Sequence, residues 1–276
     1  MAESVQLIPR ELKELQFPVA RFLTLEEQAK YEEACKSFGE KARNTLNVDL
    51  KGSNLFKVIL LNQIGIKTAT LPELDLIVEN NSKFLEGTYE DAPSVVLRSA
   101  GDSYNHNDYV AKGLAKLIHQ KKFPHSVIIE GLKLKEDDNS SYNLSFVEGE
   151  NFKVIKAPDF DHKNNQRKFK KINPDYTIEF DRNGTRTLYT RDNGVSGLCF
   201  NRGLDLGSND DGLADSNGDG RVVVVSGEAT QNLDKYVSEL QKHKVEQDKK
   251  LASKYKVAQD ILDEAYNQAE AVFKSK

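Results

Sequence analysis

Apolar residues recur with helical spacing towards both ends of the chain. Thr24 and Glu27 stand three residues apart where an apolar pattern begins, which is the spacing of a capping box and predicts a helix start. Over residues 228–273, apolar side chains recur every three or four residues among Lys, Gln and Glu. This pattern predicts one long or two shorter helices, whose apolar positions are Leu233, Val237, Leu240, Leu251, Tyr255, Ile261, Leu262, Ala265, Ala269 and Val272.

Shorter apolar runs in the first half of the intervening region favour strands. Residues 93–99 and 125–134 are typical of buried strands, and residues 107–118 between them predict a helix capped by an Asn. Residues 54–66 are mostly apolar, so their pattern fits a strand or a buried helix equally well. The fold is therefore a mixture of helices and strands.

The following hundred residues are dominated by strand and turn patterns. The runs at residues 143–149 and 151–158 predict a meander, and residues 161–175 form a basic, polar stretch without a core pattern, which predicts a loop. Asn183 and Gly184 lie between two alternating runs, the strongest short-range signal for a β-hairpin. We expect an α+β domain over residues 51–228, preceded by a helical segment at 1–50 and followed by one at 229–276.

Composition narrows the functional classes. The chain has 276 residues, 30% of them charged, with a formal net charge of -4, so there is no electrostatic case for a nucleic-acid partner. Its apolar runs are far shorter than a membrane helix requires, and its N-terminal residues do not resemble a secretory signal. With only Cys35 and Cys199, a disulfide framework is excluded. We expect a soluble, cytoplasmic protein without membrane insertion.

One segment has an unusual composition. Residues 180–227 contain no Lys, Glu, Gln, Met or Trp, although these five types account for 63 of the 276 residues and about eleven would be expected in 48 positions. Gly, Asn, Asp and Ser take their place. Loops and turns favour such residues, but a second pattern lies inside this segment.

Between residues 196 and 209 the chain alternates with the period of a strand. Even positions carry most of the apolar residues, including Leu198, Phe200, Leu204 and Leu206, whereas odd positions carry Gly or small groups. Gly weakens an exposed strand because it loses the most backbone entropy and packs nothing. We therefore expect an even face in the core together with Leu213, and an odd face that is exposed and selected for something other than strand stability.

These residues resemble a known family. Residues 186–200 read RTLYTRDNGVSGLCF, and residues 213–230 read LADSNGDGRVVVVSGEAT. The two stretches and the alternating run between them resemble the variable proteins of diversity-generating retroelements, with a looser resemblance at residues 89–99 and 107–117. In contrast to the family's usual pattern, this chain has no Trp and continues for about fifty residues after the segment.

The resemblance implies a C-type-lectin-like fold that displays a mutable surface, here at about residues 191–221. In such systems asparagine codons are mutagenised at adenines, and the possible products exclude the five residue types absent here. The resemblance and the alternation together predict a non-enzymatic protein that binds an unidentified protein or a small polar ligand. The expected ligand-binding residues are Cys199, Asn201, Gly203, Asp205, Gly207, Asn209, Asp210, Gly212, Asp215, Asn217 and Asp219.

Calcium binding is an alternative function. Asp215, Asn217 and Asp219, followed by Gly220, match the first half of an EF-hand loop, in which oxygen ligands recur at alternate positions. The twelfth position is Ser226, where a bidentate Glu belongs, and a strand pattern follows instead of a helix. Two alternatives therefore stand for this stretch. It is either a calcium loop of another type or a solvated turn that binds no cofactor.

Two further alternatives belong to other classes. The C-terminal helices could form an oligomerisation arm of a structural or interaction protein, although they lack sustained heptads, and packing on the N-terminal helices is the simpler interpretation. An enzyme would need Asp and His residues brought together by folding, because the five histidines show no metal-ligand spacing and no nucleophile or phosphate-binding motif is present. The sequence does not predict the oligomeric state.

Overall fold

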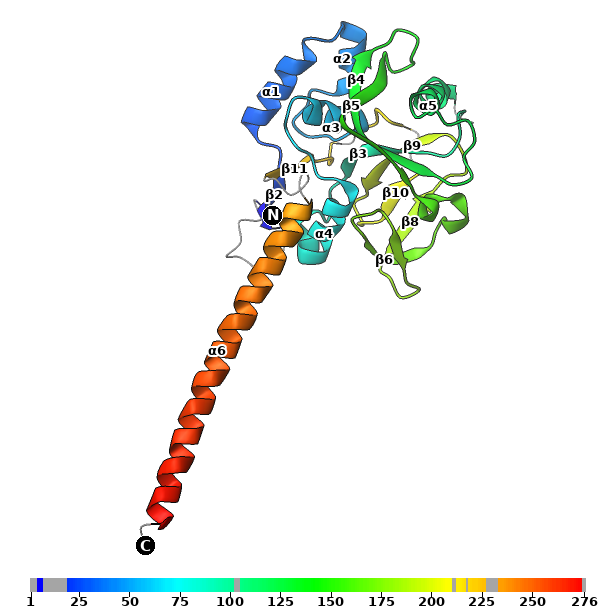
Figure 1. Cartoon of the computed structure of the whole chain (residues 1–276). Helices are drawn as coiled ribbons and strands as arrows, with labels where there is room; N and C mark the ends of the chain where they lie inside the picture. The colour runs from blue at the N-terminus through cyan, green and yellow to red at the C-terminus, as the bar shows by residue number, and fades with distance from the viewer. Residues whose placement is uncertain are drawn as a thin grey trace. The chain divides into compact units, whose positions relative to one another are not determined.

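The structure is a computed structural model that describes residues 4–6, 19–101, 105–209, 212–216, 218–226 and 233–274. The chain divides into two compact units, residues 1–226 and residues 227–276. The first unit is a mixed α+β fold, and the described residues of the second form one helix (Figure 1). The α+β class expected from the sequence is therefore confirmed.

Among the five α-helices in the described part of the first unit, those that begin at Leu25 and Leu55 have side-chain caps that the sequence supplies. At Thr24 both bonds of the capping box with Glu27 are formed, as the sequence predicts. Asn54 caps the apolar segment that the sequence left ambiguous, which is a helix. The helices are α1 (Leu25–Cys35), α2 (Glu40–Leu46), α3 (Leu55–Gln63), α4 (Leu71–Asn81) and α5 (Asn105–Leu117).

Eight described strands form the main sheet, in the order β5 (Leu144–Lys156), β4 (Val127–Glu136), β3 (Glu90–Leu97), β9 (Val195–Phe200), β10 (Leu206–Ser208), β8 (Arg186–Thr190), β6 (Lys168–Ile172) and β7 (Ile178–Phe180). Neighbouring strands run antiparallel except β10 and β8, which are parallel. A smaller sheet joins β1 (Ser4–Gln6), β2 (Val19–Phe22) and β11 (Val223–Ser226). The sheets place residues from both ends of the first unit side by side.

Both faces of the main sheet are covered (Figure 1). On one face, Val95 and Ile129 belong to a core cluster with α1, α2, α3 and α5. On the other face, Val96 and Ile128 belong to a second cluster with α4, the short 3-10 helices η2 (Ser82–Phe84) and η3 (Pro158–Phe160), and strands β6 to β8. The central strands are therefore buried on both sides.

Two strand predictions were wrong in the same region. Residues 143–158 do not form a meander, because β5 is one long strand that pairs with β4 on both sides of a register shift at Gly131. Gly131 has φ +68° and a Cβ there would overlap the backbone of Asn151, so only glycine fits this irregularity. Residues 161–175 are not simply a loop, since they contain β6 with buried Phe169 and Ile172.

The hairpin predicted at Asn183–Gly184 is also absent, because β6 lies between β7 and β8. Asp75 on α4 accepts a hydrogen bond from the Ile172 amide at 2.8 Å and forms a buried ion pair with Arg186 of β8. These contacts tie β6 and β8 to one helix. Gly184 is still required as glycine, since a Cβ would overlap the Phe169 backbone.

The second unit is helix α6 (Leu233–Lys274), a single helix of 42 residues. The sequence predicts one long or two shorter helices here, and one long helix is found. Within this unit Leu251, Tyr255, Ile261 and Leu262 are exposed. The expected packing of this helix on the N-terminal helices stays a prediction. Among the described residues, no helix is long and apolar enough to cross a membrane.

Candidate functional site

The unusual segment folds as a hairpin followed by an irregular loop. Strands β9 and β10 pair with Phe200 opposite Leu206 and Cys199 opposite Gly207, and residues 201–205 form the turn. Between β10 and β11 the structure describes residues 209, 212–216 and 218–222. Since the turn contains an odd number of residues, positions 200 and 206 share a face, which is why the strand-like alternation continued across the turn.

The structure distributes the expected ligand-binding residues over three kinds of position. Cys199 and Gly207 are buried; Asn201, Asp205, Gly212 and Asp219 are half-buried; Gly203, Asn209 and Asp215 are exposed. Asp210 and Asn217 lie outside the described residues. The exposed members are therefore in the turn and in the loop, not on the strands.

The expectation of an exposed odd face on the strands was wrong at Cys199 and Gly207. Cys199 is 4% exposed, and every residue of β9 and β10 is buried. The physical reason is that both faces of the sheet are covered, so these strands have no solvent-facing side. A Cβ on Gly207 would lie 2.6 Å from the Cys199 sulfur, which explains the small residue there by packing.

The apolar residues of the even face are buried or half-buried, and two Ser residues on the same face contact Arg98, which the pattern did not predict. Leu198, Phe200 and Leu206 belong to the second core cluster, and Leu213 is buried in the first. Leu204 is only half-buried and packs against the second cluster. Of the three even positions that are not apolar, Ser196 and Ser208 accept hydrogen bonds from the side chain of Arg98, and Arg202 is exposed.

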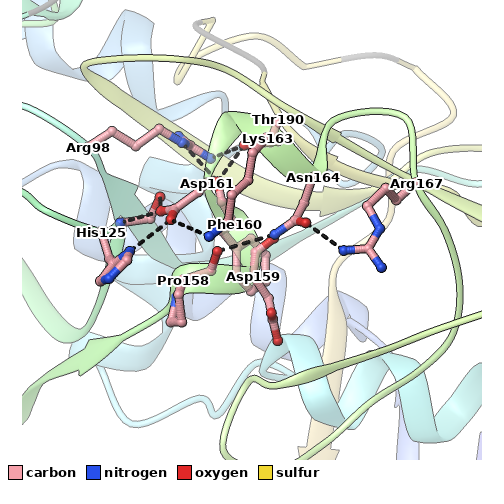
Figure 2. A network of polar contacts seen from close by, with 11 residues as sticks. Arg98, His125, Pro158, Asp159, Phe160, Asp161, Lys163, Asn164, Arg167 and Thr190 are labelled. Atoms are coloured by element: carbon pink, nitrogen blue, oxygen red, sulfur yellow. Dashed lines mark hydrogen bonds and ion pairs between the residues drawn. The ribbon is translucent and has the colours of Figure 1, made fainter.

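Arg98, which follows β3 directly, forms hydrogen bonds with both strands of the hairpin. Its Nη1 donates to Ser196 Oγ at 3.0 Å, and its Nη2 donates to Ser208 Oγ at 2.6 Å and to Ser208 O at 2.8 Å. Its Nη2 also donates to Thr190 Oγ1 at 2.7 Å and its Nε donates to Phe160 O at 3.3 Å (Figure 2). One buried guanidinium thus links β8, β9, β10 and η3.

The corner that contains Phe160 is fixed by its own polar contacts (Figure 2). Asp161 Oδ1 accepts hydrogen bonds from the Ser126 amide at 2.8 Å and from its hydroxyl at 2.9 Å, and Asp161 Oδ2 lies 2.9 Å from His125 Nδ1. Asn164, in η4 (His162–Asn164), donates to Asp159 O at 3.0 Å and accepts from Arg167 at 2.6 Å. Ser126 and His125 both contact Asp161, so the three are not arranged as a nucleophilic triad.

The hairpin turn is held by two of its own side chains. Asn201 Oδ1 accepts hydrogen bonds from the amides of Gly203 at 2.9 Å and Asp205 at 3.0 Å. Asp205 Oδ1 accepts from the Thr187 amide at 2.6 Å, and Leu204 adopts φ +65°. Asn201 and Asp205 therefore shape the turn, whereas Gly203 between them contributes an exposed position.

The loop is anchored to the segment that precedes α3. Asn54 Nδ2 donates to Ala214 O and to Thr45 O, both at 3.1 Å, while its Oδ1 caps α3 by accepting from the Lys57 amide at 2.8 Å. The Gly52 amide donates to Gly220 O at 2.9 Å. One Asn side chain thus fixes both a helix start and the acidic loop.

Buried Lys57 supports that anchoring segment from inside. Its ammonium group donates to the carbonyls of Asp49 and, at 3.2 Å, Gly52, and it lies 5.3 Å from the centre of the Tyr31 ring. Burial lowers the pKa of Lys57 to about 8, against attraction by the Asp49 carboxylate. The Lys57 side chain has a structural role, because its ammonium group donates hydrogen bonds to backbone carbonyls.

The carboxylates of the loop are partly engaged. Asp219 forms an ion pair with Arg202, and this hydrogen-bonded contact lowers the pKa of Asp219. The pair connects the hairpin turn to the loop. Among the described residues, no three His, Cys, Asp or Glu side chains form a group that could hold a metal ion. Because Asn217 lies outside those residues, the calcium hypothesis as a whole stays a prediction.

Glu90 is a buried acid beside this loop. Its Oε1 accepts a hydrogen bond from the Thr88 hydroxyl, and its Oε2 has no hydrogen-bond partner within the described part of the chain. Burial raises the pKa of Glu90 to about 8; the Thr88 hydrogen bond and Arg221 lower it, and the charges of Asp91 and Asp219 raise it. The carboxyl is thus protonated over most of the neutral range.

Arg98, Asn54 and Glu90 are not among the residues that the sequence pattern singles out. Arg98 follows a buried strand, where a charged residue is unusual, and Asn54 precedes an apolar helix at a capping position, so both left a local signal. Glu90 left no local signal in the sequence, because its burial depends on a loop more than a hundred residues away.

Comparisons of the chain with protein-family models, with curated proteins and with solved structures found no match.

Proposed function

We propose that this protein binds a ligand, without chemistry, through side chains displayed on the hairpin turn and the following loop, residues 201–220. We further propose that it is a variable protein of a diversity-generating retroelement with a C-type-lectin-like core. The observation that carries the proposal is the separation, within one segment, of exposed positions from the groups that hold the backbone.

The exposed positions can accept different side chains. Gly203, Asn209, Asp215 and Gly218 are exposed. A Cβ on Gly218 would meet no atom within 4 Å, and a Cβ on Gly203 would make ordinary contact at 3.4 Å with Asn201 Oδ1. These four positions form a smaller display set than the sequence pattern suggests.

The groups that hold the backbone come largely from outside the display set. Arg98, Asn54 and Gly52 bind the segment through main-chain carbonyls or through Ser196 and Ser208. Such contacts do not depend on which side chains occupy the exposed positions. A rigid scaffold that carries interchangeable loop side chains is the general design of binding surfaces.

The present side chains favour a polar ligand. Residues 201–221 contain no aromatic residue, whereas binding hot spots are enriched in Trp, Tyr and Arg. The polar groups of the segment are the carboxylates of Asp215 and Asp219, the amides of Asn201 and Asn209, and the Arg202 guanidinium. Of these, Asp219 and Arg202 are paired with each other, and Asn201 Oδ1 holds the turn. We expect weak binding of a polyhydroxylated or basic ligand.

The direct test is to sequence this gene in many sibling cells. We expect substitutions at the codons of Gly203, Asn209, Asp215 and Gly218, arising at adenines of a near-copy of the segment elsewhere in the same genome. Codons for Arg98, Asn54 and Ser208 should be invariant. An invariant segment without a near-copy would refute the retroelement assignment.

A second test asks whether the surface tolerates diversity. In one variant, Gly203, Asn209 and Gly218 are replaced by Tyr, Ser and Asp, respectively. Its thermal unfolding is compared with that of a control variant in which Cys199 and Gly207 are replaced. Each surface change should alter the free energy of unfolding by about 0.5 kcal/mol or less. The control set should unfold the protein, and equal losses in both sets would contradict the proposed display positions.

A further inference from the structure

The apolar residues of α6 repeat every eleven residues. Residues 251–261 read LASKYKVAQDI and residues 262–272 read LDEAYNQAEAV, so Leu, Tyr and Ala recur at the same places in both blocks. Leu240 and Phe273 extend the Leu position by one block in each direction, with Phe in the last. The apolar residues of this helix do not follow seven-residue spacing.

An eleven-residue repeat places its members on one side of a helix, because eleven residues complete about three turns. Leu251, Tyr255, Ala258, Leu262 and Tyr266 follow one another at spacings of four, three, four and four residues and form one continuous line, here called the Leu-Tyr stripe. A repeat of this length is that of helices that associate with a slight right-handed supercoil or nearly straight.

Within the second unit, the side chains of the Leu-Tyr stripe are exposed. Leu251 is 64% exposed, Tyr255 75%, Leu262 56% and Tyr266 72%. Most of the stability of protein helices comes from packing an amphipathic face, and a face with this much apolar surface favours association. A partner with the same repeat would match the stripe along its length, and a second copy of this helix has that repeat.

We propose that α6 pairs with α6 of a second copy of this chain along the Leu-Tyr stripe, so that the protein is a dimer. Small Ala258 near the middle of the stripe allows the two helices to approach closely there. The Tyr hydroxyls lie at the ends of long side chains and can remain hydrated at the edge of the contact.

The charge order along α6 indicates an antiparallel pair. Lys249, Lys250, Lys254 and Lys256 precede Ala258, whereas Asp260, Asp263, Glu264 and Glu270 follow it, with no basic residue between 257 and 273. An antiparallel pair centred beside Ala258 brings the basic block of one helix next to the acidic block of the other. It also sets Leu251 level with the second copy's Tyr266, and Tyr255 level with the second copy's Leu262.

The test is the molar mass of the full chain by analytical ultracentrifugation across a concentration series. We expect about twice 31.1 kDa for the wild type. The double variant Leu251→Ala, Leu262→Ala keeps good helix formers but removes four Leu side chains per dimer. Its dimer dissociation constant should rise by about a hundredfold or more.

The matched control is the double variant Val245→Ala, Val257→Ala. These residues are similarly exposed, at 51% and 56%, but each lies about a third of a turn or more from the Leu-Tyr stripe. Their loss should change the dissociation constant by about threefold or less. A wild type that stays at 31.1 kDa at several hundred micromolar, or a control that dissociates as readily, would overturn the proposal.

Salt dependence tests the orientation. Complementary blocks attract, so added salt should weaken an antiparallel dimer through screening. In a parallel pair, Lys would face Lys and Asp would face Asp or Glu, and salt would then strengthen association. Tighter association at high salt would overturn the antiparallel arrangement.

Discussion

Gly207 and Cys199 form a packing pair inside the hairpin. The Cys199 sulfur occupies the space that a Cβ on Gly207 would need. Neither residue is accessible, so the small size of both is explained by the core and not by a ligand. This correction reduces the proposed binding surface to the turn and loop.

The pair predicts a measurable coupling. Gly207→Ala should lower the free energy of unfolding by about 1 to 3 kcal/mol, because it overpacks a buried site. In the double variant with Cys199→Ala the sulfur is absent, so the second change should cost much less. A double-mutant cycle of urea unfolding measures this, and additive losses would show that the contact is not the cause.

Glu90 predicts a pH dependence of stability. Its carboxyl has an ordinary pKa of 4.5 and a pKa of about 8 in the folded protein, so the folded state binds the proton more tightly. This contribution is complete below pH 4.5 and is lost as pH rises through 8, at about 1.4 kcal/mol per pH unit in between. The neutral variant Glu90→Gln should lack this slope.

The measurement is the urea midpoint of wild type and Glu90→Gln between pH 5 and 9, the range in which the Glu90 contribution is lost. The two curves should converge at low pH, with the wild type falling below the variant at high pH. Glu179→Gln, a change at an exposed strand position, serves as the control and should follow the wild type. Parallel curves for wild type and Glu90→Gln would contradict the assignment.

At the scale of elements, α3 and the acidic loop share one side chain. Asn54 caps the helix with its oxygen and holds Thr45 and Ala214 with its nitrogen. Sequence rules predict only the first role, since they treat Asn and Asp as equivalent caps. The tertiary contact makes the two residues different here.

Asn54→Asp should therefore keep the cap and release the loop. We expect a loss of about 2 to 3 kcal/mol in the free energy of unfolding, because two carbonyls lose their donor and face a carboxylate. Hydrogen exchange should accelerate at the Asp215 amide, while the Lys57 amide stays protected. Asn54→Ser removes the donors without adding charge and should show the same pattern more weakly; loss of protection at Lys57 in both variants would argue against it.

The elements also show where local patterns were sufficient. The capping box at Thr24, the strands β3 and β4 and the helix α5 depend on neighbours in sequence, and all were predicted. The position of β6 depends on Asp75 of α4, which binds Ile172 and Arg186. No pattern within residues 161–184 contains that information, so the hairpin prediction at Asn183–Gly184 was wrong.

At the scale of the whole molecule, the two units differ in how much hydrophobic core they contain. Both described hydrophobic clusters lie in residues 1–226, including the α1 and α2 helices. In the proposed dimer, two copies of the proposed display surface are held in one assembly. Two weak sites on one particle then bind a multivalent target more tightly than either alone, provided that the geometry lets both engage.

Removal of residues 227–276 should leave the first unit folded. The truncated protein should melt within about 3 °C of the full chain, because no described core residue is lost. Circular dichroism should show the loss of helix expected for α6, and ultracentrifugation should report a monomer. A large fall in melting temperature would show that α6 also stabilises the first unit.

The sequence by itself determined what depends on a residue and its near neighbours: helix caps, the apolar even positions between residues 196 and 209, the helical character of the C-terminal residues and the α+β class. The tertiary structure alone decided what covers each surface. Alternation shows that a strand has two different faces, but the second face of β9 and β10 is buried because helices cover both sides of the sheet. Burial, and with it the shifted pKa of Glu90 and the exposed positions of the loop, depends on contacts between residues that are distant in sequence.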